Sequence, residues 1–233
     1  MKLTNLFTTL LLQTFLFSTA NAGVIISATD ATIDLGGPGY GLISETYDQS
    51  GLYNPYISGI TDFDEYISSN PFHTSDYNGN EWFSREYDSP EGIASVTYDL
   101  GFRTNIDAIA LWNEESSGIT FLSLFGSLDG INFFDMAQGL MPQDNPFDES
   151  RPDDDYSYAA EVFNLSNSYT RYVRFSMSGC PQQPSSFNYC SIGEVAFRTA
   201  DNTKPTEVPE PSTWSIFMMS MIGLGMKRKY INS

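Results

Sequence analysis

The sequence predicts an all-β protein. Aromatic residues make up 15% of its 233 residues, and aromatic and β-branched segments are broken by Gly, Pro, Asn and Asp, which punctuate strands. Strong helix-forming runs are missing, and no repeat of the solenoid or propeller kind is found. Once the two terminal segments are set aside, residues 23 to about 210 have a length suited to one large β domain.

The strand pattern becomes clear after residue 80. Val96, Tyr98 and Leu100 alternate with polar residues, which indicates a half-buried strand ending at Gly101. Residues 106–112 form a nearly continuous apolar run, typical of a central strand. Before these segments, residues 36–74 are rich in Gly, Tyr and Asp, so turns and one or two short strands are expected there.

Later strands follow the same rules. We expect strands at residues 119–125 and 131–136, joined by a turn with Asp-Gly as its signal. Two more are expected around 172–177 and 194–198, with Val195 and Phe197 on one face of the last strand. Between the strands at 131–136 and 172–177, residues 138–157 contain three prolines and a run of acids and are expected to form a loop.

The N-terminus has the pattern of a secretory signal peptide, residues 1–22. Lys2 supplies the positive charge, residues 6–17 form the apolar core, and Ala20-Asn21-Ala22 is an A-x-A cleavage site. Cleavage by signal peptidase after Ala22 would start the mature chain at Gly23. A buried first helix is the alternative.

The C-terminus, residues 208–233, follows a polar linker at 199–207. Pro209, Glu210 and Pro211 precede an apolar stretch, and a basic cluster at residues 227–229 follows it. This arrangement resembles the PEP-CTERM sorting signal of Gram-negative bacteria, which implies recognition and cutting by a membrane-embedded exosortase. Residues 212–226 are shorter than the ~20 residues of a comfortable bilayer span, which suits a transient membrane anchor. A plain tail anchor or an amphipathic last helix is the alternative.

The charge of the chain restricts its partners. All 29 acidic residues and only seven basic residues fall between residues 23 and 210, so the formal balance there is −22, against −18 for the whole chain. Nucleic acid is disfavoured as a partner because phosphate binding needs clustered Lys and Arg. The acidic surface suits an exported protein and could hold divalent cations.

The two cysteines, Cys180 and Cys190, bound an 11-residue segment. Export to an oxidising compartment predicts a disulfide between them. Two free thiols are the alternative, and a redox-active pair is disfavoured because the spacing is not C-x-x-C.

Six segments in order resemble the discoidin-type (coagulation-factor C-type) domain and its galactose-binding-like relatives. They are Trp82-Phe83-Ser84, VTYDLG at 96–101, IDAIALWN at 106–113, FLSLFGSLDGINF at 121–133, RYVRF at 171–175 and IGEVAF at 192–197. The resemblance covers residues 60–198 and implies an eight-stranded antiparallel jelly-roll sandwich, a non-catalytic binding fold. Residues 23–59 would then be an N-terminal extension packed on the sandwich, with the signal helix before it and the apolar helix at the C-terminus.

The chain departs from this family in two ways. The usual cysteine pair joining the domain's ends is missing, and nothing in the loops fixes a sugar-binding triad. The resemblance also implies a structural Ca²⁺, for which the matching positions are Asp76, Asn78, Asn80 and Glu194. An Asx-turn with a solvated glutamate is the alternative.

Catalytic motifs are missing. The one histidine, His73, is expected at the surface or in a turn, and neither a G-x-S-x-G elbow nor an H-E-x-x-H motif occurs. Exposed aromatics that could stack on a sugar are candidates, although core packing is favoured for each, above all for Trp82 and for the further tryptophan Trp112. These candidates are Tyr53, Tyr56, Trp82, Tyr87 and Tyr189.

Together these features predict an exported, exosortase-processed binding protein of the cell surface or extracellular matrix of a Gram-negative bacterium. It would be non-catalytic and associated with a carbohydrate or exopolysaccharide. Two alternatives stay open: a structural surface protein without a small ligand, and a glycan-active hydrolase using a pair of the many carboxylates.

Overall fold

The computed structural model describes residues 23–76, 78–84, 92–145, 157–182 and 188–200. The signal peptide and the sorting signal, with their expected helices, lie outside these residues. So do most of the acidic loop and Tyr87. No helix within the described ranges is long and apolar enough to cross a membrane.

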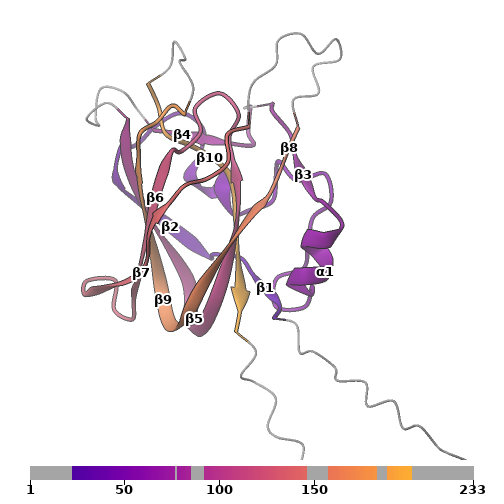
Figure 1. Ribbon diagram of the computed structural model, residues 1–233, viewed down its shortest axis with the longest axis vertical. Coiled ribbons are helices and arrows are strands. Elements are labelled where there is room, and N and C mark those ends of the chain that lie inside the picture. Colours follow the sequence, from indigo (N-terminus) through magenta and orange to yellow (C-terminus); the bar gives the residue numbers. More distant parts are fainter. Residues whose placement is uncertain (1–22, 77, 85–91, 146–156, 183–187, 201–233) are drawn as a thin grey trace, which may run out of the picture. The chain divides into compact units, whose positions relative to one another are not determined.

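The regular secondary structure of the described chain consists almost entirely of antiparallel strands (Figure 1). Eight of them form one hydrogen-bonded sheet. Six follow the order β1-β10-β5-β9-β6-β7, β2 is added on β5, and β4 is added on β10. β3 and β8 pair separately. The predicted eight-stranded antiparallel sandwich is therefore confirmed. The strands are β1 (Ile25–Ile26), β2 (Asp30–Leu35), β3 (Phe72–His73), β4 (Trp82–Phe83), β5 (Ile93–Asn113), β6 (Phe121–Ser127), β7 (Phe133–Leu140), β8 (Tyr158–Ala159), β9 (Glu161–Ser178) and β10 (Ser191–Thr199).

Two long strands, β5 and β9, carry the path from one layer of the sandwich to the other. Their first pairing block ends at Asp99–Tyr172, and the next pair is Thr104–Thr170. Between the blocks Gly101 takes a φ of +80°, which favours glycine. The prediction that a strand ends at Gly101 is wrong, because β5 bulges there and keeps β9 as its partner across the bend.

The core lies between the two layers. Val96, Tyr98 and Leu100 are fully buried, as their alternation predicts, and the Tyr98 ring meets Phe197 of the opposite layer edge-on at 6.0 Å. Both Trp82 and Trp112 are fully buried, so their predicted place in the interior is confirmed. At about 25 cal/mol per Å² of apolar surface, burial of such side chains is the main stabilising term.

The outer face of one layer is covered by the segment before β3. Phe63, Tyr66 and Tyr56 pack with Trp112 and Ala196 in a second apolar cluster. This segment holds a helix, α1 (Phe63–Ser68), and a short 3-10 turn (Ile43–Thr46), where turns and short strands were expected.

The helix has a local cause. Asp62 accepts a hydrogen bond from the backbone N–H of Glu65 at 2.8 Å and caps the first turn. The apolar face of α1 then packs on the sheet.

The segment expected as an extension, residues 23–59, also contributes strands. β1 pairs with β10, and β2 pairs with β5 from Asp30 to Leu35. These strands belong to the main sheet itself, because β2 alternates exposed acids and threonine with partly buried apolar residues.

Arg198 joins α1 to the layer beneath it. Its Nε donates to Asp107 at 2.8 Å, its Nη1 donates to Asp64 of α1 at 2.9 Å, and its guanidinium carbon lies 5.4 Å from the centre of the Phe63 ring. The chain before β10 is closed by the disulfide between Cys180 and Cys190.

Candidate functional site

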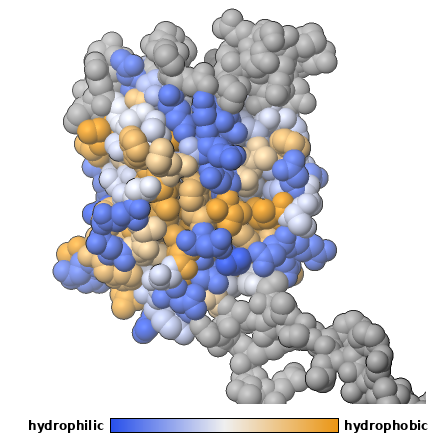
Figure 2. Space-filling model, in the orientation of Figure 1, coloured by the Kyte–Doolittle hydropathy of each residue, from blue (hydrophilic) through white to orange (hydrophobic). Residues whose placement is uncertain are grey.

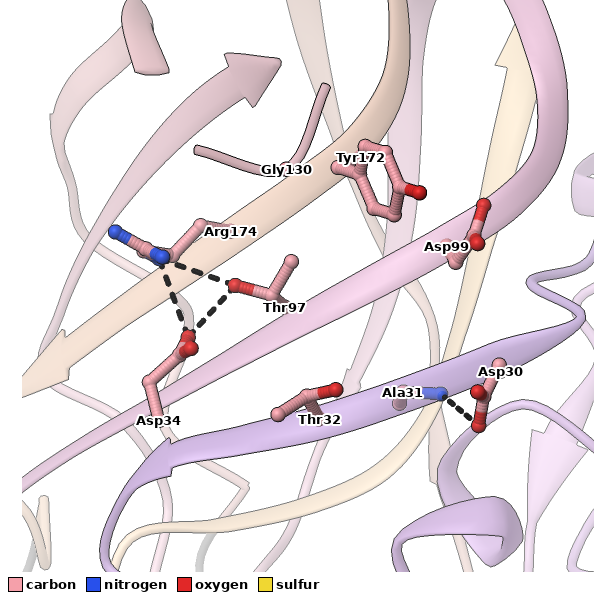
Figure 3. Close-up of a pocket in the computed structure, with 9 residues that line it drawn as sticks. All are labelled: Asp30, Ala31, Thr32, Asp34, Thr97, Asp99, Gly130, Tyr172 and Arg174. Atoms are coloured by element: carbon pink, nitrogen blue, oxygen red, sulfur yellow. Dashed lines mark hydrogen bonds and ion pairs between the residues drawn. The ribbon is translucent and has the colours of Figure 1, made fainter. Parts of the chain in front are cut away.

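The outer face of the other layer, formed by β2, the first half of β5, the second half of β9, β6 and β7, carries a polar hollow. It has a volume of about 180 Å³ and lies mainly over β2, β5 and β9. Figure 3 shows its lining: Asp30, Ala31, Thr32, Asp34, Thr97, Asp99, Gly130, Tyr172 and Arg174.

The register of the strands brings these side chains together. Asp30 lies opposite Asp99, which lies opposite Tyr172. One row further, Thr97 lies opposite Arg174. Because alternate residues of a strand point to the same face, the polar members of three strands line one surface while Val96 and Tyr98 point into the core.

One end of the hollow is a three-membered hydrogen-bond network. The Nε of Arg174 donates to Asp34 Oδ2 at 3.1 Å and to Thr97 Oγ1 at 3.0 Å, and Thr97 donates to Asp34 at 2.6 Å (Figure 3). The guanidinium carbon also lies 3.7 Å from the centre of the Phe133 ring. Among the described residues, only the Nε of Arg174 has a hydrogen-bond acceptor.

The other end is formed by Asp99 and Tyr172. Arg171 donates to both Asp99 oxygens, from Nε at 2.9 Å and from Nη2 at 2.8 Å, and these bonds hold the pKa of Asp99 below its usual range. The same guanidinium lies 5.0 Å from the centre of the Tyr172 ring and orients it.

A tight turn borders the aromatic ring. A Cβ placed on Gly130 would lie 3.5 Å from the Tyr172 ring, and Gly130 has a φ of +74°. Asp129 accepts backbone N–H bonds from Ile131 and Asn132 and holds the turn in place. The expected Asp-Gly turn thus positions one wall of the hollow.

The chemistry of the hollow is that of polar recognition on an open surface. It offers a planar guanidinium, carboxylates, threonine hydroxyls and one aromatic ring, and it is smaller than the about 300–1,000 Å³ common for enclosed small-molecule pockets. In Figure 2, polar and apolar patches alternate over the face that Figure 1 presents.

A second cluster of carboxyl groups lies away from solvent. Glu81, Glu114 and Glu115 are each at most 7% exposed, and Tyr158 donates to Glu81 at 2.6 Å. Burial and the neighbouring Glu114 raise the pKa of Glu81 well above its usual range and that of Glu115 to about 10. A hydrolase needs its paired acids in a cleft that substrate can enter, whereas these groups lie in the interior.

His73 belongs to this buried region. It is fully buried in β3, pairs across the strands with Tyr158, and has its pKa lowered to about 4 by burial. The expectation of a surface histidine is wrong, because β3 and β8 fold over the sheet and enclose the ring.

The four residues expected to bind Ca²⁺ have different surroundings. Asp76 accepts from the backbone and side-chain nitrogens of Asn78, and Asn80 donates to the carbonyl of Asp76 at 2.7 Å, an exposed Asx-turn.

Glu194 is fully buried and accepts from the backbone N–H of Gln49 at 2.9 Å. Its other oxygen, Oε1, has no hydrogen-bond partner. Burial raises its pKa well above the usual range. An orphaned carboxylate oxygen fits a cation ligand, but no hydrogen bond among the described residues joins it to the Asx-turn. No group of three or more His, Cys, Asp or Glu that could hold a metal ion is found in the described part of the chain.

The aromatic residues proposed as sugar-stacking candidates have different surroundings, some buried and some exposed. Tyr56 is buried, with its hydroxyl accepting from Ser27, whereas Tyr53 is 55% exposed. Tyr189 meets Tyr40 edge-on at 5.6 Å. None of these lines the hollow. The sequence alone did not indicate Tyr172 as a site residue. Its position beside Asp99 in the hollow depends on the β5–β9 register.

Comparisons with known proteins give matches among solved structures alone. No family model and no curated protein matches the sequence. One similar solved structure is a family 32 carbohydrate-binding module from Clostridium perfringens in complex with GalNAc-β-1,3-galactose (16% identity, 72% of this chain and 93% of that chain, TM-score 0.43).

Two others are similar to the same degree. They are a chitosan-binding module from a Paenibacillus chitosanase/glucanase (14% identity, 76% and 98% covered, TM-score 0.45) and the C-terminal domain of a Bacteroides fragilis chitobiase (17% identity, 76% and 97% covered, TM-score 0.41). Since these TM-scores lie below 0.5, the likenesses carry no conclusion about what this chain binds.

Proposed function

We propose that this chain is an exported, non-catalytic glycan-binding protein of the bacterial cell surface or extracellular matrix, and that the hollow on the open sheet face is its binding site. The observation that carries the proposal is the placement of the hollow. One layer of the sandwich is covered by the segment around α1, and the other exposes Tyr172, Arg174 and the aspartates on a rigid sheet.

The residue types suit a sugar. A pyranose presents hydroxyls along its edge and C–H groups on its faces. Planar polar side chains such as Arg174 and Asp34 can bond to neighbouring hydroxyls, and an aromatic ring such as Tyr172 can contact the C–H face. Held on strands, these groups lose little conformational entropy when the ligand binds.

Binding without catalysis agrees with the lowered pKa of Asp99 in the hollow. A glycosidase acid needs a raised pKa so that it can protonate the leaving group. The pKa of Asp99 is lowered instead, because Arg171 bonds to its charged form. Glu81 and Glu115, whose pKa values are raised by burial and by neighbouring acids, lie in the interior, away from the hollow.

Titration of the purified full-length protein with oligosaccharides tests the site. We expect Tyr172→Ala to weaken binding roughly 3–10-fold, the range of one aromatic contact. Tyr169→Ala is the matched control, because Tyr169 is 51% exposed on the same strand but outside the hollow. Equal affinities of Tyr172→Ala and the unaltered protein would place the glycan site elsewhere.

Export and processing form the second part of the proposal. The A-x-A site at Ala20-Asn21-Ala22 and the Pro209-Glu210-Pro211 motif motivate delivery across the inner membrane and cutting by exosortase, with the membrane used only in transit. We expect cells that lack exosortase to keep a longer form of the protein in the membrane fraction. An unchanged size and distribution on immunoblots would refute processing while leaving glycan binding untouched.

A further inference from the structure

We propose that the hollow prefers glycans that carry protonated amino groups, with Asp30 as the residue that recognises the ammonium. The inference rests on the proposed glycan-binding function and adds the chemical class of the ligand. Its basis is the balance of charges around the hollow.

The two arginines at the hollow are both engaged by acids. Arg174 bonds to Asp34, and Arg171 bonds to both oxygens of Asp99. Asp30 is the third acid in the lining, and no basic side chain among the described residues forms an ion pair with it. Three aspartates therefore face two arginines, and a negative charge remains at the rim.

The free carboxylate has a specific neighbour. Asp30 lies directly opposite Asp99 across β2 and β5, so two acids share one side of the hollow (Figure 3). Side chains in such cross-strand positions are about 4.5–5.5 Å apart at their Cβ atoms, and like charges there repel. Arg171 offsets one of the two charges, and a cation beside Asp30 would offset the other.

Asp30 is also free to bind. It is exposed, and its Oδ1 accepts from the backbone N–H of Ala31 at 2.9 Å, which orients the carboxylate without a second side chain. Its Oδ2 accepts no hydrogen bond from the described residues. An ammonium group on a sugar held against Tyr172 would find this oxygen at the β2 side of the hollow.

The same charges disfavour acidic glycans. A uronate placed in the hollow would meet the Asp30 charge and the formal balance of −22 between residues 23 and 210. Arg174 could bond to such a carboxylate only by releasing Asp34 or by using its terminal nitrogens beside that acid. Polyanionic chains are therefore expected to bind less well than neutral ones, and amino-bearing chains better.

Calorimetric titration of the full-length protein with three oligomers tests the inference. The probes are a chitosan oligomer, the fully N-acetylated oligomer of equal length, and an oligogalacturonate, at a mildly acidic pH at which sugar amines are protonated. We expect the chitosan oligomer to bind about 2–5-fold more tightly than the acetylated one, the range of an exposed ion pair. The difference should shrink in high salt, which screens it.

The variants separate the possible outcomes. Asp30→Asn keeps the bond from Ala31 and should bring the affinities for the amino and the acetylated oligomer together. Glu65→Gln removes one charge from α1, on the covered layer, and should leave the preference intact.

Equal binding of the amino and acetylated oligomers, or a preference unchanged by Asp30→Asn, overturns this inference and leaves the glycan site standing. Failure of the folded protein to bind any of the three oligomers counts against the glycan-binding function itself, and against the inference with it.

Discussion

The hydroxyl of Tyr158 donates a hydrogen bond of 2.6 Å to Glu81, and both side chains are shielded from solvent. The bond satisfies one oxygen of Glu81 and leaves Oε2 without a partner. Glu115 lies in the same region, and its Oε2 is likewise unpartnered. Buried acids in this situation stay protonated, because an ionised carboxylate would be poorly solvated.

The buried acids predict that stability falls as pH rises. The folded state holds the proton of Glu115 up to a pKa of about 10, whereas the unfolded chain releases it near pH 4.3. Below pH 4.3 both states are protonated and the contribution is fully present. Above it, stability falls as pH rises toward the folded pKa, because the folded state binds more protons than the unfolded chain. Urea unfolding measured from about pH 5 to about pH 9, between the pKa values of the unfolded and folded states, gives this slope.

Glu115→Gln is the matched variant. A neutral amide has no proton to keep, so we expect a shallower slope and greater stability at alkaline pH. Glu65→Gln, on the exposed side of α1, should keep the slope of the unaltered protein. A slope that is the same with and without Glu115 would show that this carboxyl ionises freely in the folded state.

The sequence predicted the sandwich better than the site. The alternation of Val96, Tyr98 and Leu100 with polar residues predicted a strand with one buried face, because such alternation is visible within a short stretch of sequence. The bulge at Gly101 was missed, since a strand that bends and keeps its partner has the same local pattern as one that ends. The alternation of β5 and β9 indicated which residues point outward, but not which of them meet.

The hollow depends on long-range register. Asp34 and Arg174 are 140 residues apart along the chain, and Asp30 meets Asp99 only through the β2–β5 pairing. A shift of one residue would turn each of these side chains to the other face. The prediction for His73 was wrong for a related reason. A polar residue in a turn-rich segment is expected to be exposed, and its burial depends on the distant strand β8, which pairs with β3.

The contacts of Arg198 predict a local loosening of α1 on its removal. Arg198→Ala would leave Asp107 and Asp64 without their donor and remove the contact with Phe63. Loss of a hydrogen bond to a charged group costs about 1.5–3 kcal/mol where the group is shielded from water, and less where water can replace the lost partner. We expect a destabilisation of about 1–3 kcal/mol, with faster hydrogen exchange in residues 63–68.

Arg198→Lys distinguishes charge from geometry. A lysine keeps the positive charge but cannot present the planar fork to two acids. It should restore only part of the lost stability. Full rescue by lysine would show that charge alone holds α1 to the sheet, and unchanged exchange in Arg198→Ala would contradict the role of this side chain.

The disulfide predicts a moderate loss of stability on reduction. Cys180 and Cys190 close a segment with a sequence separation of 10, and Cys190 is fully buried beside β10. In the chain-entropy model a loop of this size stabilises by roughly 2–3 kcal/mol. Chemical unfolding of the protein with both cysteines replaced by serine or by alanine measures the loss, the alanine pair being the control for buried hydroxyls. No loss in either pair would show that neighbouring contacts alone hold the segment.

Glu194 gives the sharpest test of calcium binding. Its Oε1 is buried and unpartnered, and its pKa is raised by burial, so a cation would have to displace a proton there. We expect calcium to raise the melting temperature of the unaltered protein, more at about pH 8 than at about pH 5, because less work is then needed to remove the proton. Magnesium, which demands tighter octahedral geometry, should act less.

Two variants assign the calcium ligands. Glu194→Gln should abolish the calcium-dependent rise and leave the protein folded, since the amide oxygen can still accept from Gln49. Asn80→Ala tests whether the Asx-turn with Asp76 and Asn78 takes part: loss of the rise in both variants would support one site shared by the turn and β10. Loss in Glu194→Gln alone would confine the site to the surroundings of Glu194. A melting temperature indifferent to calcium and to chelator in the unaltered protein would refute calcium binding altogether.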